Sequence, residues 1–101
     1  MAGPKTLGGW VITNHGVRAW WSVQRMLLAW GSASIALGRR PEPGEVIDGG
    51  GVKKGTYYRD LHHFEAVFPG REPFDVWDEL YRASAMRRNV ADVIQAARWS
   101  A

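Results

Sequence analysis

The sequence predicts an all-α domain, a small bundle of four to five helices. Along most of the chain, apolar residues recur at steps of three and four, the period of a helix that buries one face. Glycines and prolines fall between these stretches, where helices end. The chain has 101 residues, 46% of them apolar and six of them tryptophan, which suits one small domain with a compact core.

Composition narrows the class of protein further. The chain has no cysteine, which excludes disulfides and thiolate metal sites and fits a reducing cytoplasm. The net charge of +3 favours polyanionic partners modestly. Residues 1–41 carry five basic residues and no acid, whereas the rest carries ten acidic and eight basic residues. The N-terminal part is therefore predicted to be the positive end of the molecule.

The N-terminal part divides into a tail and a long helix. Residues 1–16 are glycine-rich and are predicted to be a flexible tail, in which residues 10–13 form a short strand or an extended anchor. The helical domain is expected to span residues 17–101 and to begin with a helix over residues 17–37. Within that helix, Gly31 either allows close approach of another helix or divides it in two. Gly38 is the expected stop.

Several shorter elements are predicted after the Arg39-Arg40 connector and its two prolines. Residues 44–49 form a short helix, Gly49-Gly50-Gly51 a turn, and residues 53–68 a second long helix. The inward positions of that helix are predicted to be Tyr57, Leu61, Phe64 and Phe68. The periodic stretches that start at Pro73 and at Asn89 fit either two helices or one bent helix.

The short helix, glycine turn and second helix have the layout of a helix-turn-helix, whose second helix lies in the major groove of DNA. The turn needs a residue with positive φ, which Gly51 can adopt. The outer face of the second helix must carry donors for phosphates and base edges. Gly55 lets a phosphate approach the backbone at the helix start. The predicted DNA-binding residues are Lys53, Lys54, Gly55, Thr56, Tyr58, Arg59 and His62.

Residues 51–58, Gly-Val-Lys-Lys-Gly-Thr-Tyr-Tyr, resemble the recognition-helix segment of the tetracycline-repressor family of bacterial regulators, which typically has Gly-Val-Ser-Lys-Gly-Thr-Leu-Tyr there. The resemblance implies that Lys54, Thr56 and Tyr58 contact DNA while Tyr57 packs inward. Lys53 stands where the family has a capping serine. The chain has no room for the ligand-binding domain of that family, so no small-molecule effector is expected. The layout also resembles small helix-turn-helix proteins of actinobacteria and their phages.

Other interpretations of these residues remain open. The central segment also fits an ordinary helical hairpin with a glycine-rich linker. His62-His63 suggests metal or general-base chemistry, but a pair of solvated or phosphate-facing histidines suits the spacing better. Trp20-Trp21 fits either base stacking or core packing with Trp21 partly exposed. Arg39-Arg40 fits either a phosphate contact or a solvated connector.

The function predicted from the sequence is double-stranded DNA binding by a helix-turn-helix transcriptional regulator of bacterial or phage origin, in the cytoplasm at the nucleoid. No enzyme activity, cofactor, metal or membrane partner is expected. A homodimer is expected because a single helix-turn-helix usually binds its site as a dimer, and residues 90–99 fit either a dimer seam or core. The alternative function is a small helical protein-interaction module or an inhibitor of a host protein. Its binding face would comprise Trp77 and the acidic residues Glu72, Asp75, Asp78 and Glu79.

Overall fold

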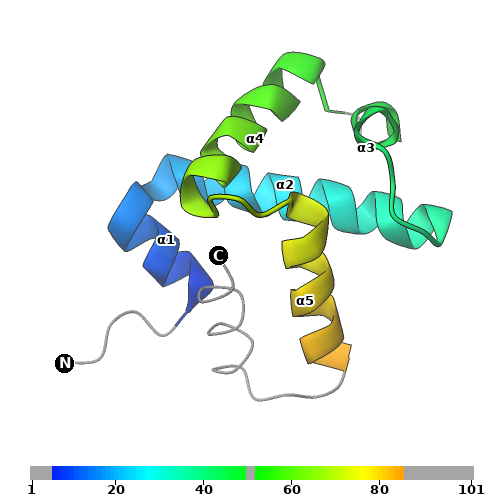
Figure 1. Cartoon of the computed structure of the whole chain (residues 1–101). Coiled ribbons are helices and arrows are strands. Elements are labelled where there is room, and N and C mark those ends of the chain that lie inside the picture. Colours follow the sequence, from blue (N-terminus) through cyan, green and yellow to red (C-terminus); the bar gives the residue numbers. More distant parts are fainter. Residues whose placement is uncertain (1–5, 50–51, 86–101) are drawn as a thin grey trace.

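The computed structural model describes residues 6–49 and 52–85, and this part of the chain consists of five helices without a strand (Figure 1). The predicted all-α class is therefore confirmed. The helices are α1 (Leu7–His15), α2 (Val17–Leu37), α3 (Pro43–Gly49), α4 (Lys54–Val67) and α5 (Pro73–Ala85).

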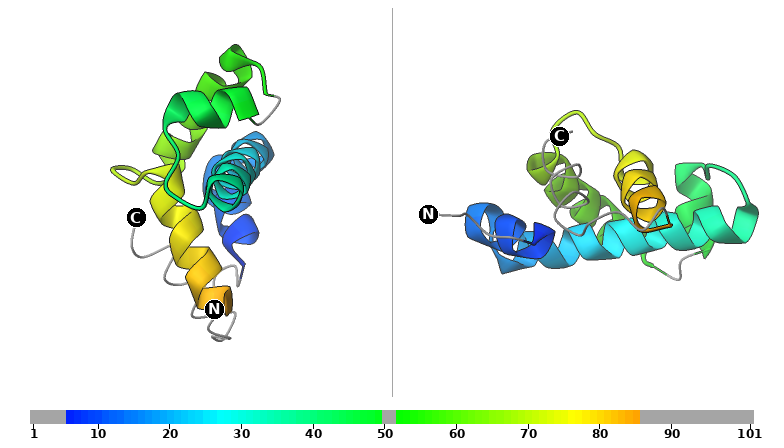
Figure 2. Two further views of the ribbon diagram at one scale, coloured as in Figure 1. Left: turned by 90° about the vertical axis from the view of Figure 1, so that its right-hand side faces the viewer. Right: turned by 90° about the horizontal axis from the view of Figure 1, so that it is seen from below.

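The long helix α2 is the axis on which the other four helices pack. Helices α3 and α4 lie on one side of it and α1 and α5 on the other, and the turned views agree (Figures 1 and 2). The helix has the predicted bounds and ends at Gly38, which has φ +69° and donates its backbone N–H to the carbonyl of Ser34. Among the described helices, none has the length and apolarity that crossing a membrane requires.

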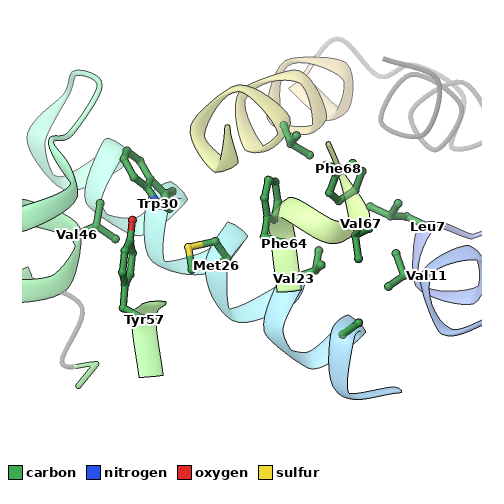
Figure 3. Close-up of a cluster of buried hydrophobic side chains, with 12 residues drawn as sticks. Leu7, Val11, Val23, Met26, Trp30, Val46, Tyr57, Phe64, Val67 and Phe68 are labelled. Carbon is green, nitrogen blue, oxygen red and sulfur yellow. The ribbon is translucent and has the colours of Figure 1, made fainter. Parts of the chain in front are cut away.

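The core is built mainly where α4 lies on α2 (Figure 3). From α2 come Val23, Met26 and Trp30, and all three are buried. Helix α4 and its C-cap residue contribute Tyr57, Phe64, Val67 and Phe68 to this core. The other helices contribute Leu7, Val11, Val46 and Val76. Each large apolar side chain buried in this way stabilises the fold by about 1.5–3 kcal/mol. The predicted inward positions of the second long helix are confirmed, with Leu61 only partly buried.

The prediction of a strand at residues 10–13, inside a flexible tail of residues 1–16, is wrong for residues 7–15. They form α1, which packs on α2 through the buried side chains of Leu7 and Val11. The Thr6 hydroxyl caps the helix by accepting a hydrogen bond from the N–H of Gly9 at 2.9 Å. A Cβ at Gly8 would stand 2.8 Å from the Trp20 ring, so this glycine serves close packing and not chain flexibility.

Helix α3 is seven residues long and is stabilised at its start by side chains. Pro43 occupies the first turn, where its missing N–H is not needed. The carboxylate of Glu45 accepts a hydrogen bond from the backbone N–H of Glu42 at 2.9 Å and receives both Nη atoms of Arg39 at 2.7 and 2.9 Å. The Arg39 and backbone hydrogen bonds lower the pKa of Glu45 to about 2. The short helix predicted over residues 44–49 is confirmed, and α3 begins one residue earlier than predicted, at Pro43.

Some predictions concern residues outside the described part. The positive φ expected at Gly51 is one, and the helix expected after Asn89 is another. Helix α4 is one residue shorter at each end than predicted, and α5 begins at Pro73 as predicted.

Gly31 allows α2 and α5 to approach each other closely, which is one of the two roles expected for it. It is buried in the unbroken helix α2, and a Cβ there would stand 2.1 Å from Nε1 of Trp77 and 2.6 Å from its Cδ1. The Trp77 ring therefore lies directly on the backbone of α2.

We expect Gly31→Ala to destabilise the protein by about 1–3 kcal/mol, because the new methyl group overlaps the Trp77 ring. In a helix without that contact, the same change stabilises by about 0.5–1 kcal/mol. Urea unfolding followed by circular dichroism measures both effects. Gly55→Ala in α4 is the matched control, since a Cβ there meets nothing within 4 Å. Equal or greater stability of Gly31→Ala would contradict the close contact.

Candidate nucleic-acid interface

Helix α4 buries one stripe on α2 and leaves its opposite face open. The buried residues are Tyr57, Asp60, Phe64 and Val67, at steps of three and four. The sequence-predicted DNA-binding residues lie mainly outside this stripe. Exposed are Lys53, Lys54, Gly55, Tyr58, Arg59 and His62, whereas Thr56 is partly buried.

The first turn of α4 lacks a capping side chain. Lys53 occupies the N-cap position with extended backbone angles, but a lysine has no acceptor to offer the first backbone N–H groups. A Cβ at Gly55 would meet nothing within 4 Å, so the backbone of this turn is open to solvent. Unpaired N–H groups, the helix dipole and two lysine ammonium groups all favour an anion at this end.

A groove of about 290 Å³ lies between α2 and α4, and we call it the α2/α4 groove. It is lined by Arg18, Trp21, Ser22, Arg25, Arg59 and His63. Three guanidinium groups therefore share one concave surface with an exposed tryptophan. Of the predicted DNA-binding residues, only Arg59 lies in it. Arg18, Trp21 and Arg25 were not among the predicted site residues, although they recur at steps of three and four along one flank of α2.

A partly buried ion pair joins α2 to α4 beside this groove. Asp60 is only 2% exposed, and its two carboxylate oxygens accept hydrogen bonds from Nε and Nη2 of Arg25, each at 2.8 Å. Such a two-pronged contact holds both side chains in one geometry. Asp60 lies on the buried stripe of α4, three residues after Tyr57 and four before Phe64, so its inward position follows from the helical spacing.

Burial alone would raise the pKa of Asp60. Hydrogen bonds from Arg25 and Ser22, and the positive charges of Arg25 and Arg59, outweigh burial and hold the pKa of Asp60 below its ordinary value. The same hydrogen bond with Asp60 raises the pKa of Arg25. The pair therefore stays ionised at neutral pH.

Ser22 extends this network to the second histidine of α4. Its Oγ lies 2.8 Å from Nδ1 of His63. The two atoms share a hydrogen bond whose donor is set by the imidazole tautomer. His63 is thus oriented by Ser22, whereas His62 is exposed. The two histidines do not act as a matched pair.

Most other charged groups in the described part pair with one another. Arg40 contacts Glu72 and Asp75 of the neighbouring acidic segment and lies over the Phe74 ring, 4.8 Å from its centroid. Arg39 pairs with Glu45, as described above. Both arginines are exposed, as the solvated-connector interpretation expects, and each also pairs with acidic side chains.

The acids of the predicted protein-binding face are also occupied. Beyond the two that contact Arg40, Asp78 pairs with Arg82 and Glu79 with Arg71. The positive groups without an acidic partner within 4.0 Å in the described residues include Arg18, Lys53, Lys54 and Arg59. Positive charge therefore gathers around α4 and the first half of α2, away from the acids of α5.

We expect Asp60→Asn to destabilise the protein by about 1–3 kcal/mol at pH 7, because a neutral amide replaces a carboxylate that accepts charged hydrogen bonds. The native pKa of Asp60 is depressed, so its contribution is present above the unfolded pKa of about 3.9 and is lost as pH falls through the native value. The stability difference between wild type and variant should therefore shrink in acid.

Urea unfolding at a series of pH values measures this difference. Glu65→Gln, on the exposed side of the same helix, is the control and should change stability by less than about 0.5 kcal/mol. Wild-type stability in Asp60→Asn at pH 7 would show that the pair does not anchor α4.

Comparison of the chain with protein-family models, with curated proteins and with solved structures gives no match.

Proposed function

We propose that this protein binds double-stranded DNA with the exposed side of α4 and the α2/α4 groove. The observation that carries the proposal is the separation of charge described above. Within residues 6–49 and 52–85, cations without acidic partners gather at α4 and the start of α2, while the arginines of the connector and of α5 are used in ion pairs. Neutralising phosphates is the main source of affinity for DNA, and it needs cations that are not already neutralised.

The proposed contacts fall into two kinds. Lys53, Lys54 and Arg59 meet phosphates, together with Arg18 from the groove. Exposed side chains on the outward face of α4, chiefly Tyr58 and His62, face the base edges in the major groove. Gly55 keeps the first turn open for a phosphate on the backbone. Thr56 is partly buried, so it contacts DNA only at its exposed edge.

Arg25 has a different part in the proposed interface. The Nε and Nη2 groups of Arg25 donate to Asp60, and the rest of the Arg25 guanidinium borders the α2/α4 groove. Its side chain is 45% exposed, so the remaining donors are within reach of a phosphate. A guanidinium that is already held in place loses little conformational entropy on binding.

The order of α3 and α4 along the chain suits a helix-turn-helix mode of binding, although α3 packs mainly on α2 and makes little contact with α4. A short helix precedes α4, both lie on the same side of α2, and Val46 and Tyr57 bury side chains in the core around α2 (Figure 3). In this mode the second helix enters the major groove while the first crosses the backbone. The resemblance of residues 51–58 to the recognition segment of bacterial repressors points to transcription control in a bacterium or phage as the setting.

The alternative, a protein-interaction module, has less support. Its acidic face at α5 is engaged in ion pairs with Arg40, Arg71 and Arg82. What remains of that face is the exposed Tyr81, stacked on the partly buried Trp77 with 5.1 Å between ring centroids.

We expect Arg59→Ala to weaken binding to a random duplex and to reduce the slope of log affinity against log salt by about 1, the change for one lost phosphate contact. Fluorescence anisotropy at several salt concentrations measures both quantities. Arg82→Ala is the matched control, because it removes an equal charge from α5, where Arg82 pairs with Asp78. It should leave the slope unchanged.

The triple variant Lys53→Ala/Lys54→Ala/Arg59→Ala should lose most of the salt-sensitive binding while remaining helical, since all three side chains are exposed. Absence of wild-type binding at low salt, with the protein folded, would refute the proposed function. Equal loss in Arg59→Ala and Arg82→Ala would place the binding face elsewhere.

A further inference from the structure

Trp21 lies on the wall of the α2/α4 groove with its indole ring open to solvent. The side chain is 56% exposed, although tryptophan is on average a highly buried residue. Its neighbour Trp20 is partly buried, and the Trp20 ring lies against Gly8 of α1. Of the two roles that the sequence allowed for this pair, core packing therefore suits Trp20, whereas Trp21 is open to a ligand.

Positive side chains stand on both sides of Trp21 along α2. Arg18 precedes it by three residues and Arg25 follows it by four, and residues at these steps have Cβ atoms about 5–6 Å apart on one helix face. The opposite wall, from α4, carries Arg59 and His63, which are also four residues apart. No acidic side chain is among the described residues that line the groove. The groove therefore offers an aromatic surface between two cations.

Two of the groove's donors are held in place by hydrogen bonds. Arg25 donates from Nε and Nη2 to Asp60, which leaves its Nη1 group for a ligand. Nδ1 of His63 is engaged with Ser22, so Nε2 is the ring nitrogen left for a ligand. Side chains that are already fixed lose little conformational entropy on binding. The groove is therefore pre-organised to hold an anion beside the Trp21 ring.

Paired DNA does not use such an aromatic surface. In a duplex the flat faces of each base are covered by the neighbouring base pairs, and proteins reach the base edges and the phosphates. An unpaired base has a free face, and stacking on an aromatic side chain favours it whatever its identity. An exposed tryptophan between two arginines therefore suits a nucleotide of a single strand, which has a phosphate on each side.

We propose that the α2/α4 groove binds an unpaired nucleotide of DNA, with its base stacked on Trp21 and its two flanking phosphates at Arg18 and Arg25. The place of this nucleotide beside a duplex rests on the proposed function. Arg59 lines the groove and also belongs to the exposed side of α4, so it stands where the two segments of DNA meet. A free mononucleotide has a phosphate on only one side, so the two arginines favour a strand. The preferred ligand is a duplex with a single-stranded overhang.

Fluorescence anisotropy with three labelled ligands tests this proposal. They are a blunt duplex, the same duplex with a short overhang of thymidines, and the same duplex with an equal overhang of abasic nucleotides. The two overhangs carry the same phosphates, so counterion release does not separate them. We expect wild type to bind the thymidine overhang roughly 5-fold or more tighter than the abasic one, because stacking one base contributes at least that much.

Equal affinity for the two overhangs would overturn the proposal, since only charge would then be bound. Free thymidine monophosphate that binds as tightly as the thymidine overhang would also overturn it, because a strand would not be needed.

Substitutions at Trp21 locate the stacked base. Trp21→Ala should remove the difference between the two overhangs while circular dichroism stays unchanged, since the side chain is exposed. Trp21→Phe should restore part of the difference. Tyr81→Ala is the matched control, because it removes an aromatic ring that is 52% exposed on α5, and it should keep the full difference. A difference that survives in Trp21→Ala would place the base elsewhere and overturn the proposal.

The blunt duplex separates this inference from the proposed function. Salt-sensitive binding of the blunt duplex, without a preference for the thymidine overhang, would refute the nucleotide site and leave the proposed function standing. If wild type bound no blunt duplex at low salt but bound single-stranded thymidines in a manner that Trp21→Ala abolishes, the proposed function would be refuted and the nucleotide site would stand.

Discussion

The contact between Arg25 and Asp60 sets the orientation of α4, and with it the surface that the protein offers to a partner. A carboxylate that is 2% exposed must keep its charged hydrogen bonds, because burying it unpaired would cost several kcal/mol. Sliding α4 along α2 by one turn would separate the two groups. The buried apolar side chains of α4 supply most of its attraction to α2, but apolar packing tolerates several registers between two helices. The Arg25–Asp60 ion pair can form in only one register, in which Tyr58, Arg59 and His62 point outward.

Three sides of α2 therefore have three different surroundings. One carries α4, with the buried pair and the basic groove. Another receives α5 through Gly31, where the Trp77 ring takes the place that a side chain would need. The third carries the exposed apolar side chains of Leu28 and Ile35. The ion pairs of the connector and α5 lie away from the α2/α4 groove, so positive charge stays concentrated beside α4. The described residues include nine Lys and Arg and nine Asp and Glu, so the basic face beside α4 arises from how the charges are arranged and not from an excess of them.

Helical periodicity predicted the class of fold and the bounds of α2, because long amphipathic helices carry their packing face in the sequence. It failed at α1, where Gly8 and Gly9 suggest a tail. There a tertiary contact, Gly8 against the Trp20 ring, overrides the low helical propensity of glycine.

The candidate site was predictable only in part. The exposed residues of α4 could be predicted from its periodicity, because they are the positions that do not face α2. The α2 residues of the groove could not be predicted in this way, because Arg18 and Arg25 precede Arg59 by dozens of residues and only folding brings them together. The pairing of Arg40 with Glu72 and Asp75 was equally hidden from local patterns, because these partners are 32 and 35 residues away in the sequence. The buried position of Asp60 could have been predicted, because it lies three residues after Tyr57 on the inward face of the helix.

The central claim is that DNA lies on α4 and the first half of α2. Titration of a labelled protein with a random duplex, followed by backbone amide NMR spectra, tests it most directly. The account predicts that the largest shifts fall on residues 53–62 and 18–25 and are reduced by added salt. Amides of α5 should hardly move. Shifts centred on α5, or no shifts at low salt in a folded sample, would contradict the account.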